Sequence, residues 1–202
     1  SPKRVTPPQT ARPEVDVPWG PVGVSLVTTG QRRLEARTFL TDGYGLRRRI
    51  EDGAVQSSPM RAIADVWQPS RLKGYVVPAG NGLPFLSAGQ AFEAQPRVRK
   101  WIAEPMVRDA ESRRVGEDML LLSCSGEVGK VTAVYPEHLK PIITHDLLRV
   151  VPRSRIDYGW IYAYMKTPIF YAMARSAQYG HMIKHLEPSH VRELPVVLPD
   201  PQ

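Results

Sequence analysis

The most informative hydrophobic pattern in the chain is a short apolar run followed by two glycines and an alternating segment. Residues 119–122 read MLLL, which is too short for a buried helix and is typical of a strand covered on both faces. Beyond Gly126 and Gly129, residues 130–134 alternate polar and apolar side chains, as a half-exposed strand does. The pattern predicts a β-hairpin whose turn can approach a partner closely, because glycine has no Cβ. A purely structural hairpin without a ligand is the alternative.

The remaining pattern predicts short strands mixed with short helices. A helix is expected to start at Ser58-Pro59 and to end before Pro69, since Met60, Ile63, Ala64 and Trp67 fall at helical spacing. Further helices are expected with Asp157 and Thr167 as N-caps, the second ending at Gly180, and a short one at residues 187–189. Residues 43–49 suit a loop or a short helix. Strands are expected at residues 22–27, 33–40, 75–77, 83–87, 142–151 and 195–198.

Composition sharpens this picture. The 20 prolines and 15 glycines favour many short elements over a helical bundle. Residues 1–21 are rich in proline and poor in apolar side chains, so we expect an extended arm there and a single folded domain at residues 22–202. No apolar run is long enough to span a membrane. The single cysteine, Cys124, cannot form an intramolecular disulfide, which predicts a cytoplasmic protein in a reducing compartment.

The chain is basic, with a formal net charge of +7, and this favours an anionic partner, with nucleic acid first. Three adjacent arginines at positions 47–49 cannot all face inward, so they meet either water or an anion. Basic side chains alternate with apolar ones at residues 96–101, which suits either backbone tracking or protection of a sheet edge. The polar residues around Gly180 suit phosphates or base edges, or they complement the dipole at a helix end. The candidate nucleic-acid contacts are Arg47, Arg48, Arg49, Arg71, Lys73, Arg97, Arg99, Lys100, Ser125, Lys130, Tyr179, His181, Lys184 and His185.

Motifs for catalysis do not fit the sequence. A phosphate-binding loop would need glycine at position 124 and Ser or Thr at position 131, where the chain has Cys124 and Val131. No acidic residue has lysine two positions later, as restriction-type nucleases require. A DNA amino-methyltransferase would need a glycine-rich loop for S-adenosylmethionine and an (N/D/S)-P-P-(Y/F) motif, and neither occurs in the sequence. The three histidines at positions 181, 185 and 190 resemble a metal site only in spacing, because Met182 stands where a zinc protease has glutamate.

Several segments, taken in order, resemble a known family. GEDMLLLSCSGEVGKVTAV (residues 116–134) resembles the central strand and small-residue turn of target-recognition domains in Type I restriction–modification specificity subunits. RLEARTFL (33–40) is similar to the opening of such modules, LPFLSAGQ (83–90) to a strand, and ITHDLLRVVP (143–152) to a late strand. The segments at residues 157–180 and 185–199 resemble the terminal helices and the closing strand.

The resemblance implies an α+β fold with a twisted, mainly antiparallel sheet and flanking short helices. It also implies that the domain reads a sequence in double-stranded DNA and does no catalysis. A partner methyltransferase subunit would then bind S-adenosylmethionine and flip the target adenine, with no cofactor on this chain and possibly with a restriction or translocase subunit. Specificity subunits usually carry two recognition domains, so the resemblance implies a second domain or a homodimer. The alternatives are a small metal-dependent nuclease or other enzyme that uses His181, His185 and His190, and a basic module that binds an acidic protein.

Overall fold

The apolar run at the centre of the sequence is the innermost strand of the protein. The computed structural model describes residues 21–24, 27, 35–180 and 184–199, so most of the predicted arm lies outside the described residues. Strand β6 (Leu120–Ser123) is buried at all four positions. It pairs antiparallel with β7 (Val131–Ala133) and with β9 (Leu147–Pro152), and β2 (Ala64–Trp67) pairs with the far side of β9. The sheet order is therefore β2-β9-β6-β7.

The predicted hairpin is confirmed, and its two glycines have the conformation that the turn requires. Gly126 and Gly129 have φ angles of 70° and 98°, in the left-handed region that other residues rarely adopt. A Cβ at Gly129 would come within 2.9 Å of the Tyr171 ring, whereas a Cβ at Gly126 would meet nothing within 4 Å. Glycine is thus required at position 129 for two reasons: the turn needs a positive φ angle, and the close contact with Tyr171 leaves no room for a Cβ.

The other strands form two further sheets. A four-stranded sheet has the order β3-β5-β4-β8, from β3 (Val76–Val77), β5 (Lys100–Ile102), β4 (Leu83–Leu86) and β8 (Ile142–Ile143). The pairing of β4 with β8 is parallel, and the other pairings are antiparallel. The third sheet joins β1 (Ser57–Pro59) to β10 (Pro195–Val197). The α+β fold class is confirmed, although three sheets replace the single one expected.

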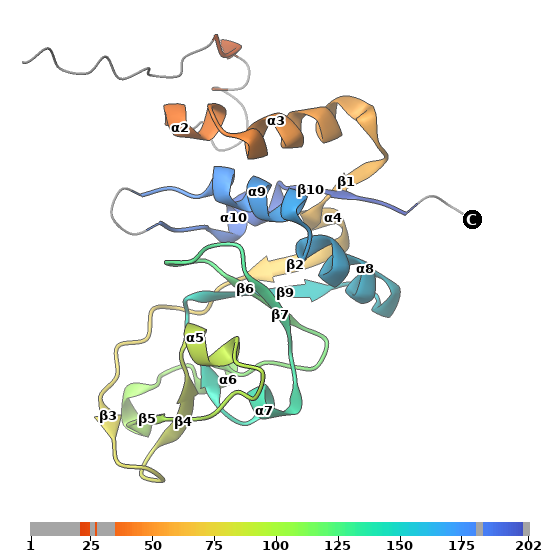
Figure 1. Cartoon of the computed structure of the whole chain (residues 1–202). Helices are drawn as coiled ribbons and strands as arrows, with labels where there is room; N and C mark the ends of the chain where they lie inside the picture. Colours follow the sequence, from red (N-terminus) through yellow and green to blue (C-terminus); the bar gives the residue numbers. More distant parts are fainter. Residues whose placement is uncertain (1–20, 25–26, 28–34, 181–183, 200–202) are drawn as a thin grey trace, which may run out of the picture.

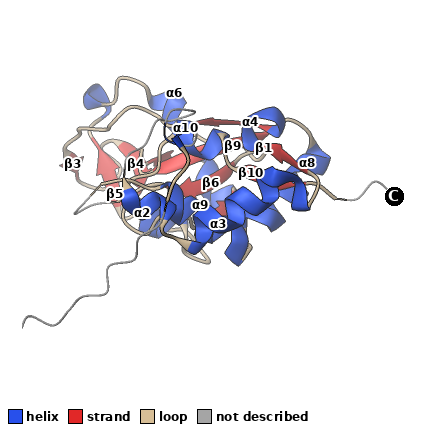
Figure 2. Cartoon of the chain, turned by 90° about the horizontal axis from the view of Figure 1, so that it is seen from above, coloured by secondary structure: helices blue, strands red, loops and turns tan. Residues whose placement is uncertain are grey.

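The longer helices form layers over the first sheet. Figure 1 shows α3 outermost, α9 and α10 beneath it, then the β2-β9-β6-β7 sheet, with β3, β4 and β5 at the opposite end of the molecule. Figure 2 shows from above that α3, α8 and α9 gather on one side of the β6 strand. The helical elements are α2 (Ala36–Phe39), α3 (Asp42–Arg49), η1 (Ile50–Ala54), α4 (Met60–Ile63), α5 (Ala88–Ala91), η2 (Glu104–Met106), α6 (Ala110–Arg113), α7 (Pro136–Leu139), α8 (Arg155–Met165), α9 (Pro168–Ala177) and α10 (Pro188–Arg192).

Two predicted elements have a different structure because long-range pairing overrides the local pattern. The expected helix over residues 58–68 is a single turn, α4, between β1 and β2. Ala64 and Val66 are buried on one face of β2, where Val66 lies opposite Val150 of β9. The expected strand at residues 142–151 is broken by a polar turn, in which the Thr144 hydroxyl accepts a hydrogen bond from the Asp146 backbone N–H at 3.2 Å. Its two halves, β8 and β9, belong to different sheets.

Other differences concern the ends of elements. Residues 36–39 form helix α2 instead of the strand expected at 33–40, and Val24 and Val27 are helical where a strand was expected at 22–27. Ser154, not Asp157, caps α8, because its hydroxyl accepts from the Asp157 backbone N–H at 3.1 Å. The predicted cap of α9 is confirmed, since Thr167 Oγ1 accepts from the Phe170 N–H at 3.2 Å. That helix ends at Ala177, three residues before the expected stop.

A fully buried arginine joins the first two sheets. Arg149 of β9 has no exposed surface, and its guanidinium donates to the backbone carbonyls of Ile143 at 3.0 Å, Thr144 at 2.9 Å, Leu147 at 2.5 Å and Arg113 at 3.2 Å. Burial, together with the nearby Arg113 guanidinium, lowers the pKa of Arg149 to about 10. The charge is thus held by peptide oxygens, which fix the turn between β8 and β9.

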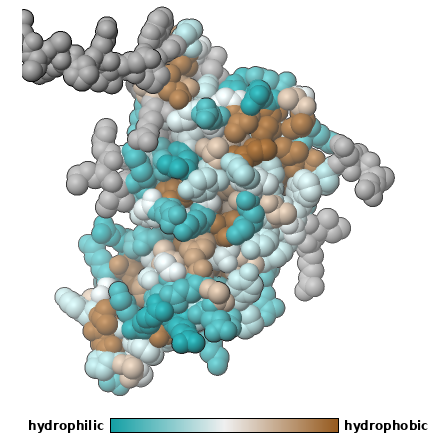
Figure 3. All heavy atoms as spheres, in the orientation of Figure 1, coloured by the Kyte–Doolittle hydropathy of each residue, from teal (hydrophilic) through white to brown (hydrophobic). Residues whose placement is uncertain are grey.

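The surface is mostly hydrophilic on the face seen in Figure 3, with two hydrophobic areas. One lies where η1, β1 and β10 meet, and Val55, just after η1, is exposed there. The other lies at β3, an edge strand that exposes Val76 next to the exposed Tyr75. Among the described residues, no helix is long and apolar enough to cross a membrane.

Candidate nucleic-acid interface

The turn after β6 and the segment that follows α9 come together in one surface. Ser125 forms an antiparallel bridge with His185, and His185 forms another with Tyr179, in which both backbone N–H···O distances are 2.8 Å. The Leu186 N–H donates to the Cys124 carbonyl at 2.9 Å. Candidates predicted from distant parts of the sequence therefore lie side by side. We call this surface the hairpin–loop junction and define it by Ser125, Tyr179, Lys184 and His185.

The junction has an aromatic centre with polar groups around it. The Tyr179 ring lies 5.9 Å from the His185 ring and 5.7 Å from the His190 ring, between centroids. Its hydroxyl donates to the Glu187 carboxylate at 2.7 Å. The Lys184 ammonium donates a hydrogen bond to the Gly180 carbonyl. This surface presents ring edges, an ammonium group and backbone polar groups, the types of group that contact phosphates and base edges.

A second polar segment borders the junction beneath β6. The Gln68 side chain donates to the His145 carbonyl at 2.6 Å and to the Cys124 sulfur at 3.4 Å. Burial lowers the pKa of His145, as do Arg71 and two buried arginines, while Asp146 opposes the shift. Burial is also the main reason why the pKa of the Cys124 thiol is raised to about 12, with Asp146 adding to it. The thiol therefore stays protonated at neutral pH, which makes it a packing group and not a nucleophile.

The arginines of α3 lie apart from the junction and have acidic partners of their own. Arg47 Nε is 2.6 Å from Glu51, and Arg48 lies 3.2 Å from Glu51 and 2.7 Å from Asp52. Arg49 is exposed. Two of the three predicted phosphate contacts are therefore engaged by carboxylates one helical turn away.

The predicted contacts at residues 71–100 belong to the second sheet and its loops, away from the junction. All five are exposed, and Arg99 forms a bidentate pair with Glu93, at 2.6 and 3.1 Å. The structure does not bring them into one cluster with the junction, although Arg71 is near enough to His145 to affect its pKa. This group consists of Arg71, Lys73, Arg97, Arg99 and Lys100. His181 lies outside the described residues.

Lys130 was predicted from the sequence, but the two cations that lie near it, Lys166 and Arg175, were not. A groove of about 490 Å³ runs between the β6–β7 turn and the corner from α8 to α9, and Lys130, Lys166 and Tyr171 line it. The Arg175 guanidinium lies 5.6 Å from the Tyr171 ring centroid. We call Lys130, Lys166, Tyr171 and Arg175 the basic groove. Its signal in the sequence was the i, i+4 spacing of Tyr171 and Arg175 on one helix.

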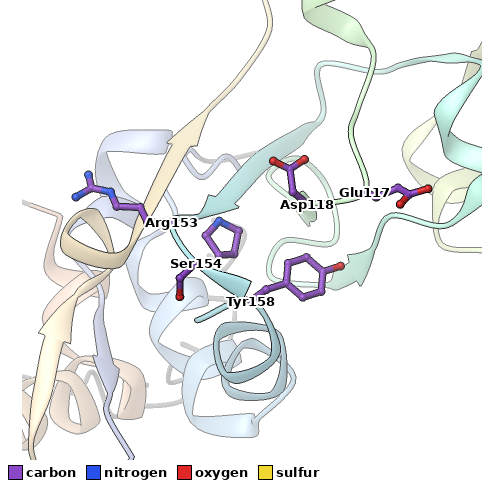
Figure 4. A pocket seen from close by; sticks show the side chains of 6 residues that line it. Glu117, Asp118, Arg153, Ser154 and Tyr158 are labelled. Carbon is purple, nitrogen blue, oxygen red and sulfur yellow. The ribbon is translucent and has the colours of Figure 1, made fainter. Parts of the chain in front are cut away.

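The arrangement offers little support for the enzymatic alternatives. His185 and His190 lie around Tyr179, and within the described part of the chain no three His, Cys, Asp or Glu side chains are grouped as metal ligands. The largest pocket described here, of about 620 Å³, is lined by Glu117, Asp118, Pro152, Arg153, Ser154 and Tyr158. In Figure 4 the Arg153 side chain points away from the two carboxylates, and it pairs with Asp65 at 3.2 Å. The Ser154 hydroxyl accepts the capping hydrogen bond of α8 from the Asp157 N–H.

Comparisons with known proteins link the fold to restriction–modification proteins. No family model matches the sequence, and no curated protein was found to be similar to it. Two solved structures are similar at TM-scores of 0.48 and 0.45: the HsdS subunit from Thermoanaerobacter tengcongensis, 18% identical over 73% of this chain, and the Type-I restriction-modification system S subunit from M. genitalium, 11% identical over 71%. A chain from a structure that describes complex assembly and conformational transition of the type I R-M system matches 73% of this chain at 18% identity and a TM-score of 0.50.

The last of these similarities supports a shared fold, so the resemblance seen in the sequence is confirmed at the level of structure. The matched regions cover 33%, 34% and 34% of the three solved chains. This chain thus spans about a third of the length of the proteins that it resembles.

Proposed function

We propose that this chain is a target-recognition domain that reads a sequence in double-stranded DNA for a partner methyltransferase. The observation that carries the proposal is the bridge between Ser125 and His185, because it joins two separately predicted nucleic-acid segments into one surface on a fold shared with a type I R-M protein. A net charge of +7 favours the approach of a polyanion. Phosphate contacts would orient the duplex, and the polar groups of the junction would read base edges.

In this proposal the chain itself does no bond-making. The methyltransferase subunit binds S-adenosylmethionine and flips the target base, and a restriction or translocase subunit completes the complex. Because the matched region covers only about a third of the solved chains, a second recognition domain or a second copy would supply the other half of the DNA site. The domain works in the cytoplasm.

The test is co-expression with the methyltransferase subunit encoded beside it, followed by mapping of methylated bases. We expect methylation at one defined sequence that disappears when this chain is omitted. Replacing Tyr179 and His185 by alanine should change or abolish that sequence preference, while the control Lys140→Gln should leave it unchanged. Methylation that does not depend on this chain, or cleavage of DNA by the purified chain alone, would refute the proposal.

A further inference from the structure

Three cations from separate segments lie around the basic groove, and two of them have no carboxylate partner among the described residues. Lys130 follows the β6–β7 turn, Lys166 ends α8, and Arg175 lies on the outer face of α9. Among the described residues, neither Lys166 nor Arg175 forms an ion pair with a carboxylate. Lys130 has one acidic partner, Glu127, at 2.7 Å, and this carboxylate is itself largely exposed.

Aromatic rings hold the two helical cations in place. The Arg175 guanidinium lies over Tyr171, and the Lys166 ammonium lies 6.0 Å from the Tyr162 ring centroid. A cation on an aromatic face keeps its charge and its N–H donors available to an anion, whereas a carboxylate partner would occupy both. Tyr171 also packs on Gly129, where a Cβ would approach within 2.9 Å, so the same ring fixes the position of the turn that carries Lys130.

The groove is lined by two lysines together with polar and apolar side chains. Its volume is about 490 Å³, and Thr167, Pro168 and Tyr171 form the wall at the start of α9. From Pro168 to Arg175 a helix rises about 10 Å. That length corresponds to about three successive phosphates of one strand, which recur about every 3.4 Å of duplex axis. Beyond Arg175 a second hollow continues to Tyr179 and Lys184 of the junction.

We propose that the basic groove binds the phosphate backbone of duplex DNA, with Lys130, Lys166 and Arg175 as the phosphate contacts and Tyr171 as the residue that positions two of them. This inference rests on the proposed function and deepens it, because it assigns sequence-independent grip to the groove and base reading to the adjacent junction. Arg175 lies at the border between the two hollows, so a strand held in the groove is directed towards the junction.

The experiment measures binding of a short, labelled duplex of mixed sequence to the full chain by fluorescence anisotropy, between about 50 and 200 mM salt. The variant carries Lys130→Gln, Lys166→Gln and Arg175→Gln. A plot of log K against log salt has a negative slope, and each lost phosphate contact makes it shallower by about 0.9. We therefore expect the slope of the variant to be shallower by roughly 2 to 3, and its affinity at low salt to fall at least tenfold. A second variant, Tyr171→Leu, should lower the affinity by a smaller factor.

A matched control removes the same number of positive charges elsewhere, through Arg61→Gln, Arg114→Gln and Lys140→Gln. Thermal unfolding of each variant shows that the fold is retained. If the control lowers the slope as much as the groove variant does, the effect comes from net charge and the inference is wrong. Tighter binding of single-stranded DNA than of duplex, or displacement of duplex by polyglutamate at equal charge, would also overturn it.

The result separates this inference from the proposed function. A wild-type chain that binds no duplex at any salt concentration contradicts both. A wild-type chain that binds duplex with a steep salt dependence, together with a groove variant of unchanged slope, contradicts only the groove. A groove variant that binds weakly but, with the methyltransferase, still directs methylation to the wild-type sequence supports the division between grip and reading.

Discussion

Helix α3 and the basic groove each present several cations, but the neighbours of those cations differ. In α3, Arg47 and Arg48 are neighbours in sequence and meet Glu51 and Asp52 one turn later. In the groove, the cations come from three segments, and tyrosine rings support two of them. A run of arginines is thus easy to recognise in a sequence, but its side chains are not free to bind an anion. The helix that carries the run also brings carboxylates into contact with it. Cations that come together only through folding are harder to recognise in a sequence and, in this protein, have fewer carboxylate partners.

The support beneath the two regions also differs. Lys130 follows a turn that leaves β6, whose leucines have no exposed surface. Helix α3 packs on α9 and leaves most of its polar face in solvent. An arginine that must first leave its own carboxylate loses that pair when it meets a phosphate, and Lys130 would likewise leave Glu127, whereas Lys166 and Arg175 have no carboxylate partner among the described residues.

The largest expected effect comes from breaking the support of the groove. Gly129→Ala places a Cβ against Tyr171 at a positive φ, and we expect it to destabilise the protein by about 3 kcal/mol through strain and overpacking. Gly126→Ala is the matched control, since its φ is also positive but its Cβ would meet nothing within 4 Å, and it should cost about 1 kcal/mol. Urea unfolding measures both, and equal costs would show that the Tyr171 contact does not fix the turn.

A smaller effect tests whether the Cys124 thiol, in the core beneath the hairpin, is shielded from solvent. Burial raises the pKa of Cys124 from 9.0 to about 12, so the folded chain keeps a proton that the unfolded chain releases above pH 9. The stabilisation is complete below pH 9 and is lost as the pH rises towards 12. Between about pH 8 and pH 10.5 the wild type should lose about 2 kcal/mol more stability than Cys124→Ala. Identical losses in urea titrations would mean that the thiol reaches solvent in the folded state.

The smallest expected effect comes from removing the two carboxylates that pair with the arginines of α3. Glu51→Gln with Asp52→Asn releases Arg47 and Arg48, and we expect duplex affinity to rise by about two- to fivefold at low salt while stability falls by less than about 1 kcal/mol. The control, Glu104→Gln with Glu111→Gln, raises the net charge equally at a distant site. Anisotropy titrations compare the two. An equal rise in both variants would show that pairing within α3 does not limit its contribution.

The sequence predicted the elements whose local pattern has one solution. The run at β6 needs cover on both faces, and the two glycines after it fit a tight turn, so that hairpin was predictable. The spacing of Met60, Ile63 and Trp67 fits a helix as well as it fits α4 followed by β2. Only pairing with β9, far along the chain, decides between them. The polar group at Thr144 and Asp146 marked the break between β8 and β9 but was assigned to a strand.

The candidate site was predictable in part, for the same reason. Ser125, Tyr179, Lys184 and His185 were selected segment by segment, and their meeting in one surface depends on a bridge that no local pattern encodes. The groove was missed because Tyr171 lies on an amphipathic helix, where an aromatic residue usually belongs to the core. The Tyr171 ring packs inward on Gly129, and the Arg175 guanidinium also lies over this ring. The DNA-contact roles of the other cations remain predictions.

The buried Arg149 has a consequence for the rigidity of the domain. One guanidinium ties β9 of the first sheet, the turn that leaves β8 of the second, and the end of α6. The two sheets therefore cannot slide past each other without breaking hydrogen bonds that water cannot reach to replace. The separation between the second sheet and the hairpin is therefore set when the chain folds.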